Sequence, residues 1–283
     1  MSPSTFPAAA FTLGPALLFA PADRPERFAK AVQRADAVIL DLEDAVAPQA
    51  KAGARENMRA SALDPATTVV RINALETAEA ALDLAAVAQS PYTTIMVAKA
   101  ADPRAIAALT EFQVVALCES AAGILAAPEL ARTPNVVALM WGAEDLVASL
   151  GGTSSRFVSG TRAGQYRAVA MQARSQLLLA AGAAGKAAID SIYADFADLA
   201  GLAEEAEDAV ASGFGAKACI HPAQIAVVRG AFQPSQAEVD AAKELLAAAS
   251  AAGTGVFAHQ GNMVDGPILL HARETLRRAG NAG

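Results

Sequence analysis

The chain has 283 residues, of which 54% are hydrophobic and 18% are charged, and its formal net charge is −7. A chain this rich in apolar residues can bury a large core, which excludes intrinsic disorder and a disulfide-stapled miniprotein. Its negative charge argues against nucleic acid or an anionic membrane as the main partner. No apolar run reaches the roughly 18 residues of a membrane span, and the N-terminal residues lack the basic stretch of a signal peptide. Because only two cysteines occur, we expect a reducing compartment, and hence a soluble cytoplasmic protein.

Residues 1–12 show no periodic pattern and are interpreted as a loose N-terminal arm. Beyond them, short continuous apolar runs alternate with longer Ala-rich segments of helical spacing, as expected for buried parallel strands and their connecting helices. The expected strands are 16–19, 37–40, 69–72, 95–98, 114–118, 136–141, 187–189 and 216–220. The expected helices are 24–34, 51–62, 77–89, 103–112, 121–127, 161–181, 199–212 and 223–230.

Eight successive strand–helix units predict an α/β fold, a closed (β/α)8 TIM barrel over residues 13–232. The alternative is an open doubly wound sheet, which usually carries a Gly-rich phosphate-binding turn after its first strand. The corresponding turn, residues 20–24, contains no glycine. Residues 233–283 add expected helices over 235–252 and 268–278 but no second core, so we expect a C-terminal helical extension that acts as a lid or arm.

A TIM barrel builds its functional face where the strands end and the following loops begin. Nearly every expected strand delivers ionisable side chains to this end. They are Asp41, Glu43, Asp44, Arg71, Lys99, Glu119, Glu144, Asp145, Asp190 and His221. A chain with so few charges has little reason to gather them at one face unless a cation or a charged substrate balances them.

Glu119 and Asp145 follow neighbouring strands, so their carboxylates can converge on one point. Mg²⁺ typically takes one or two carboxylates and completes its octahedron with water and substrate oxygens. The lack of clustered His or Cys disfavours zinc. The alternative is that both carboxylates form salt bridges with Arg71 and Lys99 at the barrel mouth, and the spacing alone does not decide between the two.

Arg71 closes a β-branched run, and its planar donor fork suits an enolate or a carboxylate. Its other possible role is to neutralise the acidic cluster of Asp41, Glu43 and Asp44. His221 is either a base or a hydrogen-bonded structural residue, which is the commoner fate of a single histidine at a strand end.

A cationic stretch lies between Asp145 and Asp190, where the chain has no acidic residue but several arginines. Arg156, Arg162 and Arg167 accompany a Gly- and Ser-rich loop that suits the phosphates of a nucleotide-like carrier. A solvated helix face or a subunit contact explains the same stretch.

Seven sequence strings carry a family resemblance. They are PADRPERFAKA, AVILDLEDAV, VVRIN, ALCESAAGI, WGAEDL, ACIHPAQI and MVDGPILLHA. In this order and spacing, from about Pro15 to Arg278, the chain resembles the citrate lyase β-subunit-like branch of the HpcH/HpaI aldolase superfamily. It is most similar to the stand-alone bacterial members, which resemble malyl-CoA and citramalyl-CoA lyases.

The resemblance implies a Mg²⁺-dependent TIM barrel that assembles as a trimer or hexamer. By matching position, Glu119 and Asp145 take the metal-ligand places, Arg71 takes a catalytic and substrate-binding place, and Asp265 matches a catalytic acid that a neighbouring subunit's C-terminal arm supplies. The implied substrate site consists of Arg71, Glu119, Gly142, Ala143 and Glu144, with backbone N–H groups at the start of a helix holding the substrate carboxylate.

The implied reaction is retro-aldol cleavage of a 3-hydroxyacyl-CoA to acetyl-CoA and a 2-oxo acid, or its reverse. No Schiff base is required, so Lys99 is expected to be structural. Residues 13–16 replace an Arg-Ser pair of many members, so a contact to the acyl group is expected to differ. The alternatives are a citrate lyase β subunit acting on an acyl-carrier thioester, a carrier-free class II pyruvate aldolase, and a barrel that only binds CoA or metal as a regulator.

Overall fold

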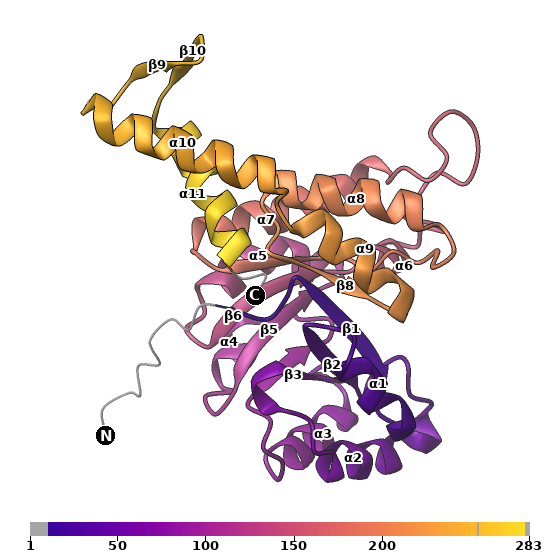
Figure 1. Ribbon diagram of the computed structural model, residues 1–283. Helices are drawn as coiled ribbons and strands as arrows, with labels where there is room; N and C mark the ends of the chain where they lie inside the picture. The colour runs from indigo at the N-terminus through magenta and orange to yellow at the C-terminus, as the bar shows by residue number, and fades with distance from the viewer. Residues whose placement is uncertain (1–10, 254, 281–283) are drawn as a thin grey trace. The chain divides into compact units, whose positions relative to one another are not determined.

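The computed structural model describes residues 11–253 and 255–280 (Figure 1). Eight parallel strands form a closed barrel in chain order, and β1 pairs with β8 to close it. The strands are β1 (Ala16–Pro21), β2 (Ala37–Asp41), β3 (Thr68–Ile72), β4 (Thr94–Val97), β5 (Gln113–Cys118), β6 (Val136–Trp141), β7 (Ala187–Asp190) and β8 (Ala216–Cys219). The predicted (β/α)8 barrel is confirmed, because an open sheet would leave β1 and β8 unpaired.

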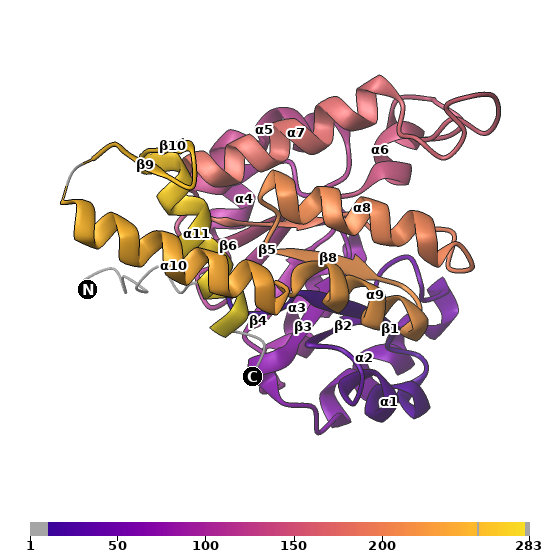
Figure 2. The ribbon, with the colours of Figure 1, turned by 45° about the horizontal axis from the view of Figure 1, so that its top comes forward.

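Helices connect the strands and cover the outside of the barrel (Figure 1). They are α1 (Phe28–Val32), α2 (Lys51–Ala60), α3 (Ala78–Val87), α4 (Pro103–Ala107), α5 (Ala121–Arg132), α6 (Ala143–Ser149), α7 (Ala168–Ala183), α8 (Leu199–Ser212) and α9 (Pro222–Phe232). Short 3-10 turns lie at η1 (Pro25–Arg27), η2 (Pro48–Ala50) and η3 (Pro65–Thr67). In Figure 2, α5 and α7 run side by side on this outer layer.

The expected helix over 161–181 was placed too early. α7 begins at Ala168, and the preceding residues form a loop in which Arg156 and Tyr166 make an antiparallel bridge. Gly160 and Gly164 have φ values of 80° and 82°. This left-handed conformation suits glycine and interrupts a right-handed helix, so the Ala-rich helical pattern continues only beyond the loop.

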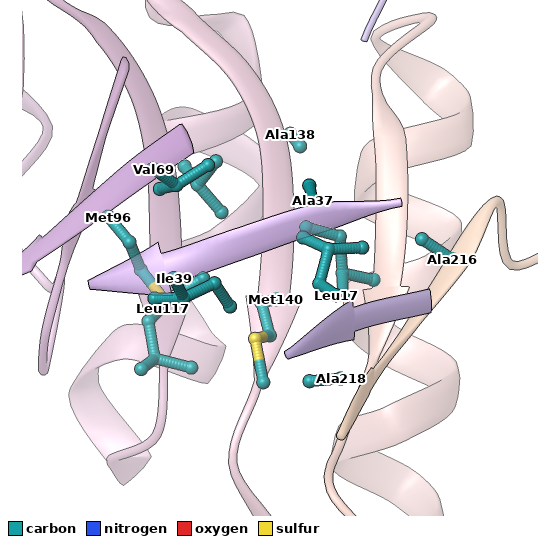
Figure 3. Packing of buried hydrophobic residues seen from close by; sticks show 12 residues of the cluster. Leu17, Ala37, Ile39, Val69, Met96, Leu117, Ala138, Met140, Ala216 and Ala218 are labelled. Atoms are coloured by element: carbon teal, nitrogen blue, oxygen red, sulfur yellow. The ribbon is translucent and has the colours of Figure 1, made fainter. Parts of the chain in front are cut away.

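Alternate residues of the strands fill the barrel interior, because successive side chains in a strand point to opposite faces. The interior cluster is Leu17, Ala37, Ile39, Val69, Met96, Val115, Leu117, Ala138, Met140, Ile189, Ala216 and Ala218 (Figure 3). Small alanines on β2, β6 and β8 lie among larger Leu, Ile and Met side chains, which lets the layers interdigitate. The same alternation fixes which strand-end side chains point into the barrel mouth.

A second compact unit begins at Arg229, within α9. It contains α10 (Gln236–Ala252), the antiparallel strands β9 (Phe257–His259) and β10 (Asn262–Val264), and α11 (Gly266–Gly280). Ser235 caps α10 in a capping box with Glu238, and α10 packs against α11. Both helices were expected, but the β9–β10 hairpin within the Gly-rich segment was not.

The expected loose arm over residues 1–12 lies almost entirely outside the described residues. Phe11 and Leu13, which the structure does describe, pack against the barrel core. Across residues 11–253 and 255–280, no helix is both long and apolar enough to cross a membrane.

Two glycines at the third position of their helices give a matched test of the packing. A Cβ on Gly123 of α5 would lie 2.5 Å from the carbonyl oxygen of Ala100, whereas a Cβ on Gly53 of α2 would meet nothing within 4 Å. We expect Gly123→Ala to lower the free energy of unfolding by about 1–3 kcal/mol through overpacking. Gly53→Ala should raise it by about 0.5–1 kcal/mol through helix propensity. Urea unfolding measures both, and a Gly123→Ala protein as stable as wild type would contradict the packing described.

Candidate active site

The side chains that share the inward alternation of the core meet at the carboxyl ends of β2, β3 and β5. Each of them lies two residues after an inward-pointing core residue of its own strand. Asp41 comes two residues after Ile39, Arg71 two after Val69, and Glu119 two after Leu117. Since parallel strands end together in a barrel, these three groups are delivered to one mouth. The strand-end prediction therefore holds for them.

Arg71 is held in a fixed orientation by Asp41. Its Nε donates to Asp41 Oδ1 over 2.8 Å and its Nη2 donates to Asp41 Oδ2 over 2.6 Å, which makes a bidentate pair. The guanidinium also lies over the Phe19 ring, 4.8 Å from its centroid, and its Nη1 is 3.2 Å from Glu43 Oε2. Burial lowers the pKa of Arg71, but the bonds to Asp41 more than reverse this, so the pKa lies above its usual value. The arginine is permanently charged, and its plane is set.

Asp41 is itself fixed by the loop that follows β2. Its carboxylate accepts hydrogen bonds from the backbone N–H groups of Glu43 at 2.8 Å and Ala45 at 3.3 Å. The Lys51 ammonium donates to the carbonyl of Glu43 at 2.9 Å and to Asn73 Oδ1 at 2.8 Å, tying this loop to the end of β3. These contacts support both halves of the Arg71–Asp41 pair. From the sequence alone, Asp41 was one of three acids, with Glu43 and Asp44, that Arg71 could neutralise.

Glu119 and Asp145 approach a common point. The Glu119 side chain is 3% exposed and that of Asp145 is 41% exposed, and one carboxylate oxygen of each lies 3.9 Å from Lys99 Nζ. Burial raises the pKa of Glu119 to about 8, and the Asp145 charge adds to this rise while Arg71 and Lys99 oppose it. Glu119 and Asp145 therefore lie close together at a place where added positive charge would favour the ionised form of Glu119.

Gly142 provides the space that Glu119 occupies. A Cβ at Gly142 would lie 2.7 Å from Glu119 Cβ and 2.8 Å from Glu119 Oε2, closer than real side-chain atoms approach. The following residues begin α6. The N–H of Ala143 donates to Ser191 Oγ at 3.3 Å, and the Glu144 carboxylate accepts a hydrogen bond from Ser155. The Glu144 side chain therefore secures the loop before α7.

Asp190 does not belong to this mouth, contrary to the strand-end expectation. Ile189 points into the core, so Asp190 points outward between the sheet and the helices. There it accepts hydrogen bonds from Trp141 Nε1 at 2.7 Å, Arg174 Nε at 3.0 Å and Lys217 Nζ at 2.9 Å. It is a buried structural acid.

Four other candidates have partners within the chain. His221 stacks on Phe196 with ring centroids 5.3 Å apart, and its Nδ1 accepts from the N–H of Ala223. Arg156 donates to Glu205 at 2.5 Å and lies over the Tyr166 ring. The guanidinium of Arg162 lies over Phe157, as does that of Arg167. These contacts represent the hydrogen-bonded structural role for His221. The Arg156–Glu205 ion pair is a contact within the chain that the sequence did not predict.

Asp265 lies in the second compact unit, between β10 and α11, where its carbonyl accepts a hydrogen bond from the N–H of Leu269. The MVDGP motif, through which the sequence singled out Asp265, therefore lies at the start of α11.

The donor set at the mouth fits a hard divalent cation. In the part of the chain that the structure describes, no three His, Cys, Asp or Glu side chains are grouped to hold a metal by themselves. Glu119 and Asp145 supply two oxygen ligands, the number that Mg²⁺ commonly takes from a protein before water and substrate complete its shell. Because the pKa of Glu119 is raised, an added cation would stabilise the ionised form of this carboxylate.

Comparison with known proteins identifies the family. The model for HpcH/HpaI aldolase/citrate lyase matches residues 16–222. The chain belongs to this family. A citrate lyase subunit beta-like protein of Mycobacterium tuberculosis is 52% identical over 269 residues, covering 95% of this chain and 97% of the relative.

A crystal structure of the M. tuberculosis protein CitE in complex with magnesium, acetoacetate and coenzyme A has a TM-score of 0.88 and 51% identity, covering 97% of this chain and 100% of that one. Two Cereibacter sphaeroides enzymes are also similar. A (3S)-malyl-CoA thioesterase is 35% identical, with 87% of each chain covered, and an L-malyl-CoA/beta-methylmalyl-CoA lyase is 33% identical, with 93% of each covered. The predicted membership of a lyase family is confirmed.

The pKa of Glu119 gives a pH-dependent prediction. Because the folded-state pKa is about 8 and the ordinary value is 4.5, the folded chain holds a proton that the unfolded chain releases between these values. The free energy of unfolding in EDTA should therefore fall as the pH rises from about 5 to 8, with a slope of up to about 1.4 kcal/mol per pH unit. Glu119→Gln should remove this component. Identical pH dependence of urea unfolding in the two proteins would contradict the buried, protonated carboxyl.

Proposed function

We propose that the protein is a Mg²⁺-dependent carbon–carbon lyase that cleaves a 3-hydroxy-3-carboxyacyl-CoA, such as malyl-CoA or citramalyl-CoA, to acetyl-CoA and a 2-oxo acid, or catalyses the reverse condensation. The observation that carries the proposal is the convergence of Glu119 and Asp145 beside an arginine whose fork is fixed by Asp41. The lyase family and the CitE complex with magnesium and coenzyme A support it.

Glu119 and Asp145 are the proposed ligands of Mg²⁺. A bound Mg²⁺ supplies Lewis acidity, which polarises the oxygen that becomes the keto group of the 2-oxo acid. Gly142 keeps Glu119 in place by leaving room for its side chain. Of the three residues proposed to bind the substrate carboxylate through backbone N–H groups, Ala143 already donates to Ser191. Gly142 and Glu144 remain the stronger candidates.

Arg71 is the proposed stabiliser of the thioester enolate. Cleavage of the carbon–carbon bond leaves negative charge on the thioester oxygen, and a preorganised charged donor lowers the energy of that state without having to reorient. Two of its donors are engaged by Asp41, while Nη1 faces Glu43 across 3.2 Å. Asp41 thus positions Arg71 and leaves part of the guanidinium for substrate.

Asp265 is the proposed acid that gives a proton to the methylene carbon of the enolate, and takes it back in condensation. We propose that residues 233–283 form an arm that supplies Asp265 to the barrel, residues 13–232, of a neighbouring subunit in a trimer or hexamer. The proposed setting is the cytoplasm, and the partners are an acyl-CoA thioester and a 2-oxo acid.

A substrate screen separates this proposal from its alternatives. Purified protein is incubated with malyl-CoA, citramalyl-CoA and citryl-CoA, with and without Mg²⁺, and acetyl-CoA, 2-oxo acid and free CoA are quantified. Equal amounts of acetyl-CoA and 2-oxo acid support a lyase. Free CoA with the intact hydroxy acid indicates a thioesterase. Activity only on an acyl-carrier thioester indicates a citrate lyase β subunit, aldolase activity on free pyruvate indicates the class II enzyme, and binding without turnover indicates a regulator.

Arg71→Lys tests the role of the fork. Lysine keeps the charge but cannot make the bidentate pair with Asp41 or present a fixed planar donor. We expect kcat to fall by about 10²–10³, the usual effect of losing one preorganised donor. The exposed Arg104→Lys on α4 is the matched control and should keep wild-type kinetics. A normal kcat in Arg71→Lys would reduce Arg71 to a structural partner of Asp41.

Mixing inactive variants tests Asp265 and the assembly together. Asp265→Ala and Arg71→Ala proteins should each be inactive. If one subunit's arm serves another's barrel, co-refolded mixtures contain interfaces that pair an intact Asp265 with an intact Arg71, and activity should return. Native mass spectrometry verifies that the subunits have mixed. Mixed oligomers without recovered activity would show that the arm serves its own barrel or takes no part in the chemistry.

A further inference from the structure

Lys99 has an unusual backbone conformation at the edge of the site. Its φ is 53°, in the left-handed region, and among the described residues the only other non-glycine with a positive φ is Gln260 in the β9–β10 turn. Met96 on β4 points into the core, so regular alternation would direct residue 98 inward and Lys99 outward. The left-handed backbone breaks this alternation, and the Lys99 side chain reaches the carboxylates of the mouth. Such strain persists where the surrounding structure enforces it.

The Lys99 ammonium lies among four carboxylates that form a near pair and a far pair. In the near pair, Nζ is 2.5 Å from Glu43 Oε1 and 3.5 Å from Asp44 Oδ2. In the far pair, Nζ is 3.9 Å from Glu119 Oε1 and 3.9 Å from Asp145 Oδ1. The backbone N–H of Lys99 also donates to Glu119 Oε1 at 3.1 Å. Lys99 thus contacts both proposed metal ligands and has a closer set of partners beside them.

Lys99 and Mg²⁺ compete for the far pair, because both are positively charged. Arg71 and Lys99 both face Glu43 and Glu119 with positive charge, but Asp41 holds the guanidinium of Arg71 in place, so Lys99 is the one of the two whose charge can move. A dication between Glu119 and Asp145 would repel an ammonium this close and would take the oxygens that the ammonium faces. Because the side chain is 39% exposed and its stem is flexible, the ammonium can withdraw onto Glu43 and Asp44.

We propose that Lys99 is a built-in competitor that lowers the Mg²⁺ affinity of the Glu119–Asp145 site, with Glu43 and Asp44 as the place to which its ammonium withdraws. This inference rests on the proposed function, because it takes Glu119 and Asp145 as the metal ligands. It assigns Lys99 a positioning and tuning role that a purely structural lysine would not have, and it gives the acids after β2 a purpose beyond orienting Arg71.

Isothermal titration calorimetry with Mg²⁺ alone tests the proposal without any need for turnover. Lys99→Met keeps the length and the backbone N–H but removes the charge, so its Mg²⁺ Kd should fall by at least about tenfold. Lys99→Gln is a second neutral variant should Lys99→Met fold poorly. Lys99→Arg keeps the charge and should stay close to wild type. Lys186→Met, which removes the same charge at the opposite end of the barrel, should stay within about threefold of wild type because salt screens distant charges.

A double-mutant cycle tests the withdrawal site. Glu43→Gln weakens the near pair and should raise the Mg²⁺ Kd in the presence of Lys99, since the ammonium is then held more by the far pair. In the Lys99→Met background the same change removes only a distant negative charge, so its effect should be at least about threefold smaller. Equal effects in the two backgrounds would show that Glu43 does not retain Lys99.

Glu119→Gln distinguishes the failure of this inference from failure of the metal site. If Glu119→Gln abolishes Mg²⁺ binding while Lys99→Met and Lys99→Gln bind with the wild-type Kd or more weakly, competition by Lys99 is refuted and the proposed metal site stands. If wild type does not bind Mg²⁺, or Glu119→Gln binds it as wild type does, the metal site is wrong and the inference falls with it.

Discussion

The bidentate pair between Arg71 and Asp41 is the constraint on which the site depends. The guanidinium can present a fixed donor only because Asp41 holds two of its nitrogens and is itself held by backbone N–H groups of the loop after β2. That loop also places Glu43 between Arg71 and Lys99. A change in the β2 loop therefore alters the orientation of the arginine and the charge around the neighbouring carboxylates together, although none of its residues needs to contact substrate.

Much of the fold followed from the sequence because each link between residue pattern and structure is local. Continuous apolar runs predicted buried parallel strands, and their number predicted closure. The start of α7 was misplaced because two glycines in left-handed conformation, Gly160 and Gly164, outweighed the Ala-rich pattern around them. The β9–β10 hairpin was missed since its strands are short and its Gly-rich sequence is equally compatible with an irregular loop.

The sequence predicted which residues contribute to the site, but not how their side chains are arranged. Strand-end position placed Asp41, Arg71, Glu119 and Asp190 in one group, whereas the alternation of side chains separates Asp190, which faces the helices beside Lys217. Counting alternation from Ile189 would have made this distinction from the sequence. Lys99 is the opposite case. Its left-handed backbone overrides alternation, and no residue pattern signals a positive φ at a lysine.

The central claim is that Glu119 and Asp145 together form a divalent-cation site at the mouth of the barrel. Crystals grown with Mn²⁺ in place of Mg²⁺ and measured at the manganese absorption edge test it most directly, because the anomalous signal locates the ion without reference to activity. The account predicts one strong peak about 2.1 Å from a carboxylate oxygen of each residue. A peak bound elsewhere, or a mouth without a peak at saturating Mn²⁺, would contradict it.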